Sequence, residues 1–321
     1  MKKALMFSLL CLISLNSFCW GFFGHQRINY FAVFLLPPEM MAFFKPNIQF
    51  ITDHAIDPDK RRYAVKDEAP KHYIDIDNYG KYPYPDLPRN YDDAVKKFGK
   101  DSVIENGIVP WWIQTMQQRL TYAFKERNQA KILKYAAELG HYIADSHVPL
   151  HASSNHDGQN SNQKGIHGFW ESRVPELLAD KEFDFMIGKA SYIKDIPGYV
   201  WKRVLESGAA SDTVLQFEAT LTKSMPGDKK YAFEERSGKV IKQYSAEFTI
   251  AYNNMMNGMV ERRMRLSIAS VASFWYTAWI NAGQPDLKNI TMTAFSEEDM
   301  SEFESLNSAW KSNSIKGRQH E

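Results

Sequence analysis

The segment from His141 to His151 constrains the fold of this chain more than any other. It reads His-Tyr-Ile-Ala-Asp-Ser-His-Val-Pro-Leu-His and follows residues 131–140, whose apolar side chains recur at helical spacing. His141 and Asp145 are four residues apart, so both side chains project from one face of that helix. Pro149 ends the helix, and His151 comes just after it. Two imidazoles and a carboxylate at a helix end are suited to a metal ion, although His141 and Asp145 could instead form a hydrogen-bonded core pair.

A second pair of a histidine and a carboxylate lies further along the chain. Residues 152–166 contain Ser, Asn, Gln and Gly and almost nothing apolar, which predicts a mobile loop. His167 follows this loop, and Glu171 comes four residues later in a helix that we expect to begin here. Taken alone, the pair is simply a helix-start histidine beside an exposed glutamate.

Further nitrogen and oxygen donors are scattered over the first half of the chain. His25 opens an expected helix, Asp57 precedes a proline in a turn or helix cap, and His72 lies in a short segment of extended character. His147 is six residues after His141 and faces away from it, so we interpret His147 as structural. The histidines left outside any candidate site are His54, His147, His156 and His320.

Residues 1–19 have the features of a secretory signal. Lys2 and Lys3 form the charged start, residues 4–15 are apolar, and Ser17 and Cys19 provide small side chains for cleavage. Cleavage after Cys19 makes Trp20 the first residue and leaves a mature chain without cysteine. A lipoprotein signal that retains Cys19 is the alternative. We therefore expect an exported protein, periplasmic or extracellular, without a transmembrane segment.

Helical periodicity returns along most of the chain, which predicts an all-α fold. With 321 residues and 44% hydrophobic composition, the chain can bury a large core. We expect one multi-helix domain over residues 20–295 with long loops, followed by a polar tail over residues 296–321. The formal net charge of +1 gives no global basic excess that would indicate nucleic-acid binding.

The donors in chain order carry a family resemblance. The order Trp-x4-His, Asp…His, His-x3-Asp-x5-His and His-x3-Glu resembles the superfamily of zinc-dependent phospholipase C and zinc-dependent single-strand nucleases. The resemblance covers about residues 20–180 and implies an all-helical phosphodiesterase with three zinc ions. Nitrogen and oxygen donors without thiolate suit catalytic zinc.

The resemblance also implies which residues bind which zinc ion. Asp57, His72, His141 and Asp145 would hold the first ion. His151, His167 and Glu171 would hold the second. The third would take the Trp20 amine and carbonyl, His25 and a bridging oxygen of Asp145.

The same resemblance suggests roles in catalysis. Zinc ions lower the pKa of a shared water from about 15.7 toward ~7, so that hydroxide can attack a phosphodiester. Asp57 would orient the attacking water, and Lys60 or Arg61 would stabilise a phosphate oxygen. Asp75 lies where the nucleases hold a nucleobase.

The sequence leaves the substrate open between a phospholipid headgroup and single-stranded nucleic acid. Glu171 as the last ligand and the short loop before His167 resemble phospholipase C, whereas Lys60 and Asp75 resemble the nucleases. The near-neutral charge argues against a basic strand-binding groove, although tyrosines between residues 79 and 84 could provide a stacking platform. We favour phospholipase C-type activity, with a nuclease as the alternative and a non-catalytic zinc-stabilised binding protein as the third. We infer no obligate protein partner.

Overall fold

The computed structural model describes residues 21–236, 238–288, 290, 293–312 and 315–316. Its regular structure is helical apart from one hairpin, so the predicted all-α class is confirmed. The signal segment, Trp20 and His320 lie outside the described residues. Within the described part, no helix combines the length and the apolar character needed to cross a membrane.

Four helices form the centre of the molecule: the second, third and fourth pack against one another, and the first packs against the third and fourth. They are α1 (Gly21–Val33), α7 (Val109–Lys125), α8 (Gln129–Asp145) and α14 (Met259–Asn281). Between them lie large buried side chains such as Phe124, Tyr142 and Trp275. The indole of Trp275 stacks on Phe44 and donates a hydrogen bond to the Ala136 carbonyl at 3.0 Å. This core supports the end of α8 that carries the predicted metal ligands.

Shorter helices and one hairpin surround this centre. The remaining α-helices are α2 (Pro38–Phe44), α3 (Ile48–Asp53), α4 (Asp57–Arg61), α5 (Tyr91–Phe98), α6 (Lys100–Glu105), α9 (Ile166–Gly168), α10 (Val174–Glu182), α11 (Ile196–Ser224), α12 (Gly227–Lys230), α13 (Ala246–Met255) and α15 (Glu297–Lys311). The 3-10 turns are η1 (His54–Ile56), η2 (Lys66–Lys71), η3 (Ile76–Tyr79) and η4 (Pro149–Ala152), and η5 (Phe169–Arg173) is a π turn. Strands β1 (Tyr231–Arg236) and β2 (Lys239–Tyr244) pair antiparallel, with Tyr231 opposite Tyr244.

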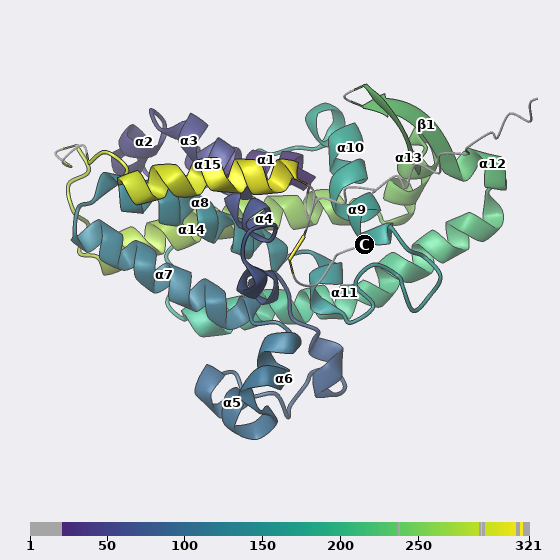
Figure 1. Cartoon of the computed structure of the whole chain (residues 1–321), viewed down its shortest axis with the longest axis horizontal. Coiled ribbons are helices and arrows are strands. Elements are labelled where there is room, and N and C mark those ends of the chain that lie inside the picture. Colours follow the sequence, from purple (N-terminus) through teal and green to yellow (C-terminus); the bar gives the residue numbers. More distant parts are fainter. Residues whose placement is uncertain (1–20, 237, 289, 291–292, 313–314, 317–321) are drawn as a thin grey trace, which may run out of the picture.

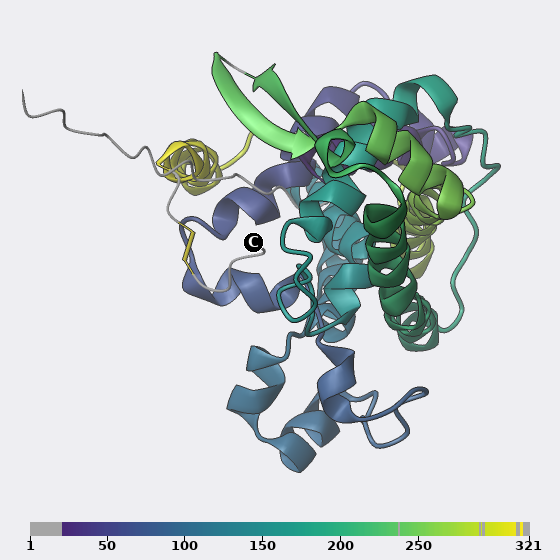
Figure 2. The same ribbon diagram turned by 90° about the vertical axis from the view of Figure 1, so that its right-hand side faces the viewer.

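Figures 1 and 2 show how these elements are arranged in space. Helix α11 runs along the molecule beside α7, and the hairpin lies at the far end of the chain's helical body, beside α12 and α13. Helices α5 and α6 project from the rest of the molecule in both views. They belong to the tyrosine- and proline-rich excursion that follows His72 in the sequence.

Helix α15 occupies most of residues 296–321, for which the sequence predicts a polar tail. Its apolar residues Phe303, Leu306 and Trp310 are spaced for one helical face, and Leu306 is buried. Ser296 caps the helix in a reciprocal arrangement with Asp299. Two ion pairs from Lys134 on α8, at 2.6 Å each, hold the helix to the body. A narrow apolar stripe in a polar sequence is therefore sufficient to dock this helix.

Candidate metal centre

A buried cluster of imidazoles and carboxylates lies where the elements around α8 meet. Its members come from α1, the turn after η2, α8, η4, α9 and η5, although they are far apart in the sequence. None is more than 1% exposed to solvent. They are His25, His72, His141, Asp145, His151, His167 and Glu171.

Asp145 is the carboxylate at the centre of the cluster. Its Oδ2 lies 3.0 Å from Nδ1 of His72 and 3.3 Å from Nε2 of His141. Its Oδ1 lies 3.4 Å from Nε2 of His25 and 3.8 Å from Nε2 of His151. Burial raises the pKa of Asp145, but the neighbouring imidazoles of His141 and His151 outweigh that effect and hold the pKa well below its usual range. One ionised carboxylate thus faces histidines from four different segments.

The approach of α1 to α8 depends on a glycine one residue before His141. A Cβ on Gly140 would lie 2.0 Å from the amide oxygen of Asn29, so any larger residue would push the two helices apart. Asn29 uses this closeness to donate a hydrogen bond to the Ala137 carbonyl at 3.0 Å. One turn earlier on α1, His25 stacks on His141 with 3.8 Å between the ring centroids.

His167 and Glu171, the second predicted pair, also lie close together, although the chain changes from α-helix to a π turn between them. Nε2 of His167 on α9 lies 3.1 Å from Oε1 of Glu171, which belongs to the π turn η5. His151 completes the group, with its Nε2 3.5 Å from Oε2 of Glu171 and 3.3 Å from Nε2 of His167. The loop before His167 is ordered by the buried carboxylate of Asp157, which accepts backbone N–H groups from Gly165 and His167.

Backbone carbonyls fix the orientation of three of the imidazoles. Nδ1 of His141 donates to Ala55 at 2.8 Å, Nδ1 of His151 donates to the His72 carbonyl at 2.7 Å, and Nδ1 of His167 donates to the His156 carbonyl at 2.9 Å. A carbonyl only accepts, so each Nδ1 carries the hydrogen, and in the neutral imidazole each Nε2 then keeps a lone pair directed into the cluster. Hydrogen bonds of this kind are typical of histidines that bind metal.

Several buried polar atoms of the cluster have no hydrogen-bond partner within the described part of the chain. They include both ring nitrogens of His25, Nε2 of His72 and Oδ1 of Asp145, and both carboxylate oxygens of the neighbouring Asp59 also have none. Buried polar atoms nearly always have partners, so converging lone pairs without protein donors fit a bound cation. Three groups of donor atoms lie close enough to hold one ion each: His25, His141 and Asp145; Asp59, His72 and His141; and His151, His167 and Glu171. Imidazole and carboxylate donors without thiolate suit zinc.

The carboxylate beside His72 and His141 belongs to Asp59, whereas the family resemblance implied Asp57 there. Oδ1 of Asp59 lies 3.7 Å from Nε2 of His141 and 3.9 Å from Nδ1 of His72. Asp57 faces the other way, with Oδ2 2.5 Å from Nδ1 of His54 and Oδ1 3.3 Å from Nζ of Lys60. Two residues correspond to about 200° around a helix of 3.6 residues per turn, so the two aspartates of Asp-Pro-Asp point to opposite sides.

The three other candidate residues lie outside the donor groups. Lys60 is buried beside Asp57. Arg61 pairs with Glu138 at 2.5 Å, Glu302 at 3.0 Å and Glu68 at 3.4 Å, so it links α4 to α8 and α15.

Asp75 is buried, and its backbone N–H donates to the Asn106 carbonyl at 2.7 Å. Burial, with Asp75 as a nearby negative charge, raises the pKa of Tyr79 to about 12. The structure does not bring Asp75 into the cluster of imidazoles that surrounds Asp145.

Glu68 and His54, for which the sequence predicted no role, contact residues of the candidate site. Glu68 is fully buried, with Oε1 3.7 Å from Nε2 of His72, and it accepts hydrogen bonds from Lys71 at 2.6 Å and from the Tyr142 hydroxyl. His54 holds Asp57. The four-residue spacing of Glu68 and His72 is the sequence signal that could have indicated the first contact. His147 is structural as expected, with hydrogen bonds to the Ile143 carbonyl at 2.8 Å and to Ser270 at 3.0 Å.

The start of α1 lies against the turn that carries Glu171. Gly21 has φ of +38°, and a Cβ there would lie 2.9 Å from Oγ of Ser172. Only glycine combines this conformation with this close approach. The residue that follows Trp20 therefore lies beside a candidate metal ligand.

Comparisons with known proteins connect this geometry to a family. Searches of curated proteins and of solved structures found no match. A family model described as S1/P1 nuclease matches residues 20–263, which is most of the chain and includes every residue of the cluster. The chain belongs to the S1/P1 nuclease family, within the superfamily of zinc-dependent phospholipase C and nucleases, and is a zinc-dependent hydrolase of phosphate ester bonds.

Proposed function

We propose that this protein is an exported endonuclease that cleaves single-stranded DNA or RNA at a site that holds three zinc ions. The observation that carries the proposal is the buried cluster around Asp145 in a chain that matches the S1/P1 nuclease model over residues 20–263. This match favours the nuclease over the phospholipase C-type activity that was predicted from the sequence. Export rests on the signal-like residues 1–19, which lie outside the described part of the structure.

The donor groups support a ligand assignment for each ion. Asp59, His72 and His141 would hold one zinc ion, and His151, His167 and Glu171 would hold another. His25 would hold the third with the amine and carbonyl of Trp20. Asp145 would bridge, because its two oxygens face different histidines. Zinc ions bound here would stabilise negative charge on the phosphodiester and lower the pKa of water.

Residues around the cluster would position the ligands and the substrate. The carbonyl of Ala55 orients His141 through a hydrogen bond at 2.8 Å, and the carboxylate of Glu68 lies 3.7 Å from Nε2 of His72, whose Nδ1 faces Asp145. Lys60 would supply a positive charge for a phosphate oxygen, and Asp57 would hold its ammonium group in place at 3.3 Å. Arg61 already faces three carboxylates, so we assign it to holding α4 in place rather than to binding phosphate.

The test is an assay of purified protein that begins at Trp20. Substrates are a single-stranded DNA, the same DNA as a duplex, an RNA and phosphatidylcholine vesicles, each with and without chelator and with zinc added back. We expect cleavage of the single strands that chelator abolishes and zinc restores, with the Asp145→Asn variant as the inactive control. Hydrolysis of phosphatidylcholine alone would support the phospholipase instead. Bound zinc without turnover of any substrate would support the non-catalytic binding protein.

A further inference from the structure

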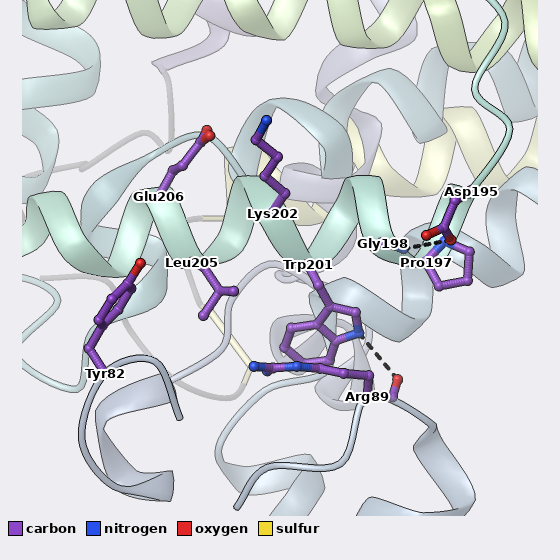
Figure 3. A pocket seen from close by; sticks show the side chains of 9 residues that line it. All are labelled: Tyr82, Arg89, Asp195, Pro197, Gly198, Trp201, Lys202, Leu205 and Glu206. Atoms are coloured by element: carbon purple, nitrogen blue, oxygen red, sulfur yellow. Dashed lines mark hydrogen bonds between the residues drawn. The ribbon is translucent and has the colours of Figure 1, made fainter. Parts of the chain in front are cut away.

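A surface cavity of about 590 Å³ lies between the first half of α11 and the loop that precedes α5. Tyr82 and Arg89 line it from the loop, and Trp201, Lys202 and Leu205 line it from α11 (Figure 3). The cavity lies outside the metal centre, and none of the residues that line it has a role in the proposed reaction.

The side chain of Arg89 is arranged to bind an anion. Its guanidinium lies over the ring of Trp201 at 4.5 Å, and Nη2 donates to the carbonyls of Pro83 at 3.2 Å and Tyr84 at 3.5 Å. Nη1 is buried without a hydrogen-bond partner among the described residues. Figure 3 shows the guanidinium pointing toward the side of the cavity on which Tyr82 lies. This nitrogen could donate to a phosphate oxygen.

Two cations, Arg89 and Lys202, and two acids, Asp195 and Glu206, are the charged residues that line the cavity. Glu206 pairs with Arg203 at 2.9 Å, and Asp195 accepts the N–H of Gly198 at 3.0 Å as the cap of α11. Within the described part of the chain, neither Arg89 nor Lys202 has an acidic partner within 4.0 Å. The two acids are therefore engaged, whereas Arg89, which lies on the same side of α11 as Tyr82, is available to an anionic ligand; Figure 3 shows Lys202 and Glu206 on the opposite side of the helix.

Tyr82 provides an exposed ring on the same side of α11 as Arg89. Its side chain is 63% exposed, whereas the neighbouring Tyr79 and Tyr84 are buried. Tyr82 contacts Tyr84 edge to face, with 6.0 Å between the ring centroids. One face of an exposed aromatic ring supported in this way can stack on an unpaired base.

The cavity and the metal centre lie along the same helix. A Cβ on Gly208 of α11 would lie 3.7 Å from the Tyr84 hydroxyl and 3.6 Å from the carbonyl of Ala152, the residue after His151. Gly208 is seven residues beyond Trp201, which is about 10 Å at 1.5 Å per residue. A strand cleaved at the metal centre can therefore reach the cavity within a few nucleotides.

We propose that this cavity is a nucleotide subsite for the substrate strand, in which Tyr82 stacks on a base and Arg89 binds a phosphate. The inference rests on the proposed nuclease function and extends it, because the subsite lies some nucleotides from the bond that is cleaved. It selects single strands, since a paired base does not offer its face to Tyr82.

The experiment compares a thymidine dinucleotide with a twelve-residue oligothymidylate. Tyr82→Ala and Arg89→Gln should each lower kcat/KM on the oligomer about five- to tenfold and leave the dinucleotide within about twofold of the wild type. Tyr82→Phe should behave as the wild type because it keeps the ring. The matched control is Tyr122→Ala on α7, where the tyrosine is 61% exposed. Equal losses on both substrates, or no loss on either, would overturn the proposal.

A binding measurement separates this inference from the proposed function. Fluorescence anisotropy with a labelled phosphorothioate oligothymidylate, which resists cleavage, reports binding to the zinc-loaded protein without turnover. Tyr82→Ala should raise the Kd at least fivefold relative to the wild type and to Tyr122→Ala. If the wild type cleaves no nucleic acid but shows this difference, the nuclease proposal fails and the subsite stands. If Tyr82→Ala leaves the Kd unchanged, or the wild type does not bind the oligomer, the subsite is wrong whatever the nuclease assay shows.

Discussion

The two aspartates of α4 give the sharpest prediction, because the sequence favours one as a metal ligand and the structure places the other in the cluster. Asp57→Asn and Asp59→Asn are nearly isosteric changes two residues apart. Each removes one negative charge from the same five-residue helix. Opposite orientations of the two side chains predict opposite consequences.

The expected magnitudes follow from the contacts of each carboxylate. Asp57 binds His54 at 2.5 Å and Lys60 at 3.3 Å, and hydrogen bonds to charged groups contribute about 1.5–3 kcal/mol each, so Asp57→Asn should destabilise the metal-free protein. Each kcal/mol lowers the Tm by about 2–4 °C in a domain of this size class. Asp59 has no hydrogen-bond partner in the described part of the chain and contacts Arg62 only through an ion pair at 3.8 Å, so Asp59→Asn should lower this Tm less than Asp57→Asn does. The zinc affinity of the Asp59→Asn variant should fall at least 100-fold, since removal of a residue that only hydrogen-bonds to a metal ligand already lowers metal affinity about 10–100-fold.

The assay combines thermal unfolding of chelator-treated protein with zinc titration against a competing indicator. Asp53→Asn is the control, because Asp53 is exposed on α3 and bonds only to Gln49 among the described residues. We expect a clearly lower Tm with retained zinc for Asp57→Asn, and a smaller loss of Tm with lost zinc for Asp59→Asn. Loss of zinc from Asp57→Asn, with normal zinc in Asp59→Asn, would refute the structural assignment and restore the one from sequence.

Three further predictions concern the bridge, the chain start and α15. Asp145→Asn should lose more zinc and more activity than His25→Ala, since Asp145 faces four histidines. Equal zinc content of the two variants by elemental analysis would contradict the role of Asp145 as a bridging ligand. One extra residue before Trp20 should lower zinc content by one ion, and full occupancy would show that the amine is not a ligand. Burial alone would raise the pKa values of Glu302 and Asp299, but the ammonium of Lys134 outweighs burial and lowers both pKa values. The two carboxylates therefore stabilise the docking of α15 fully at pH values above their ordinary pKa of about 4, and this stabilisation is lost as the pH falls through their lowered pKa values. Hydrogen exchange in α15 should therefore rise selectively below about pH 4, and uniform exchange across the molecule would argue against this.

Local spacing made much of the cluster predictable. His141 and Asp145 share a face because any α-helix places residues four apart on one side, and this holds whatever surrounds the helix. The same rule brought His167 and Glu171 together, although the turn between them is a π turn that the sequence did not indicate. The amphipathic helices from Val109 and through residues 131–145 also follow from local pattern.

Long-range packing explains the elements that were not predicted. Helix α15 has few apolar residues, and its docking depends on Lys134 and on neighbours that no local pattern shows. Strand β1 lies in a charged segment whose pattern is that of a loop, β2 opens a stretch of helical pattern, and pairing of the two strands creates the hairpin.

The sequence by itself determined the helical class, the donor chemistry and the metal-ligand pairs within single turns, because these depend on residue type and on spacings of a few residues. Only the tertiary structure decided that Asp59 rather than Asp57 faces His72 and His141, since neighbouring packing sets the rotation of a five-residue helix. It also decided that Tyr82 stays exposed while Tyr84 is buried, and that donors from segments far apart in the sequence meet at Asp145. Burial and convergence are properties of the packed chain, and no local spacing contains them.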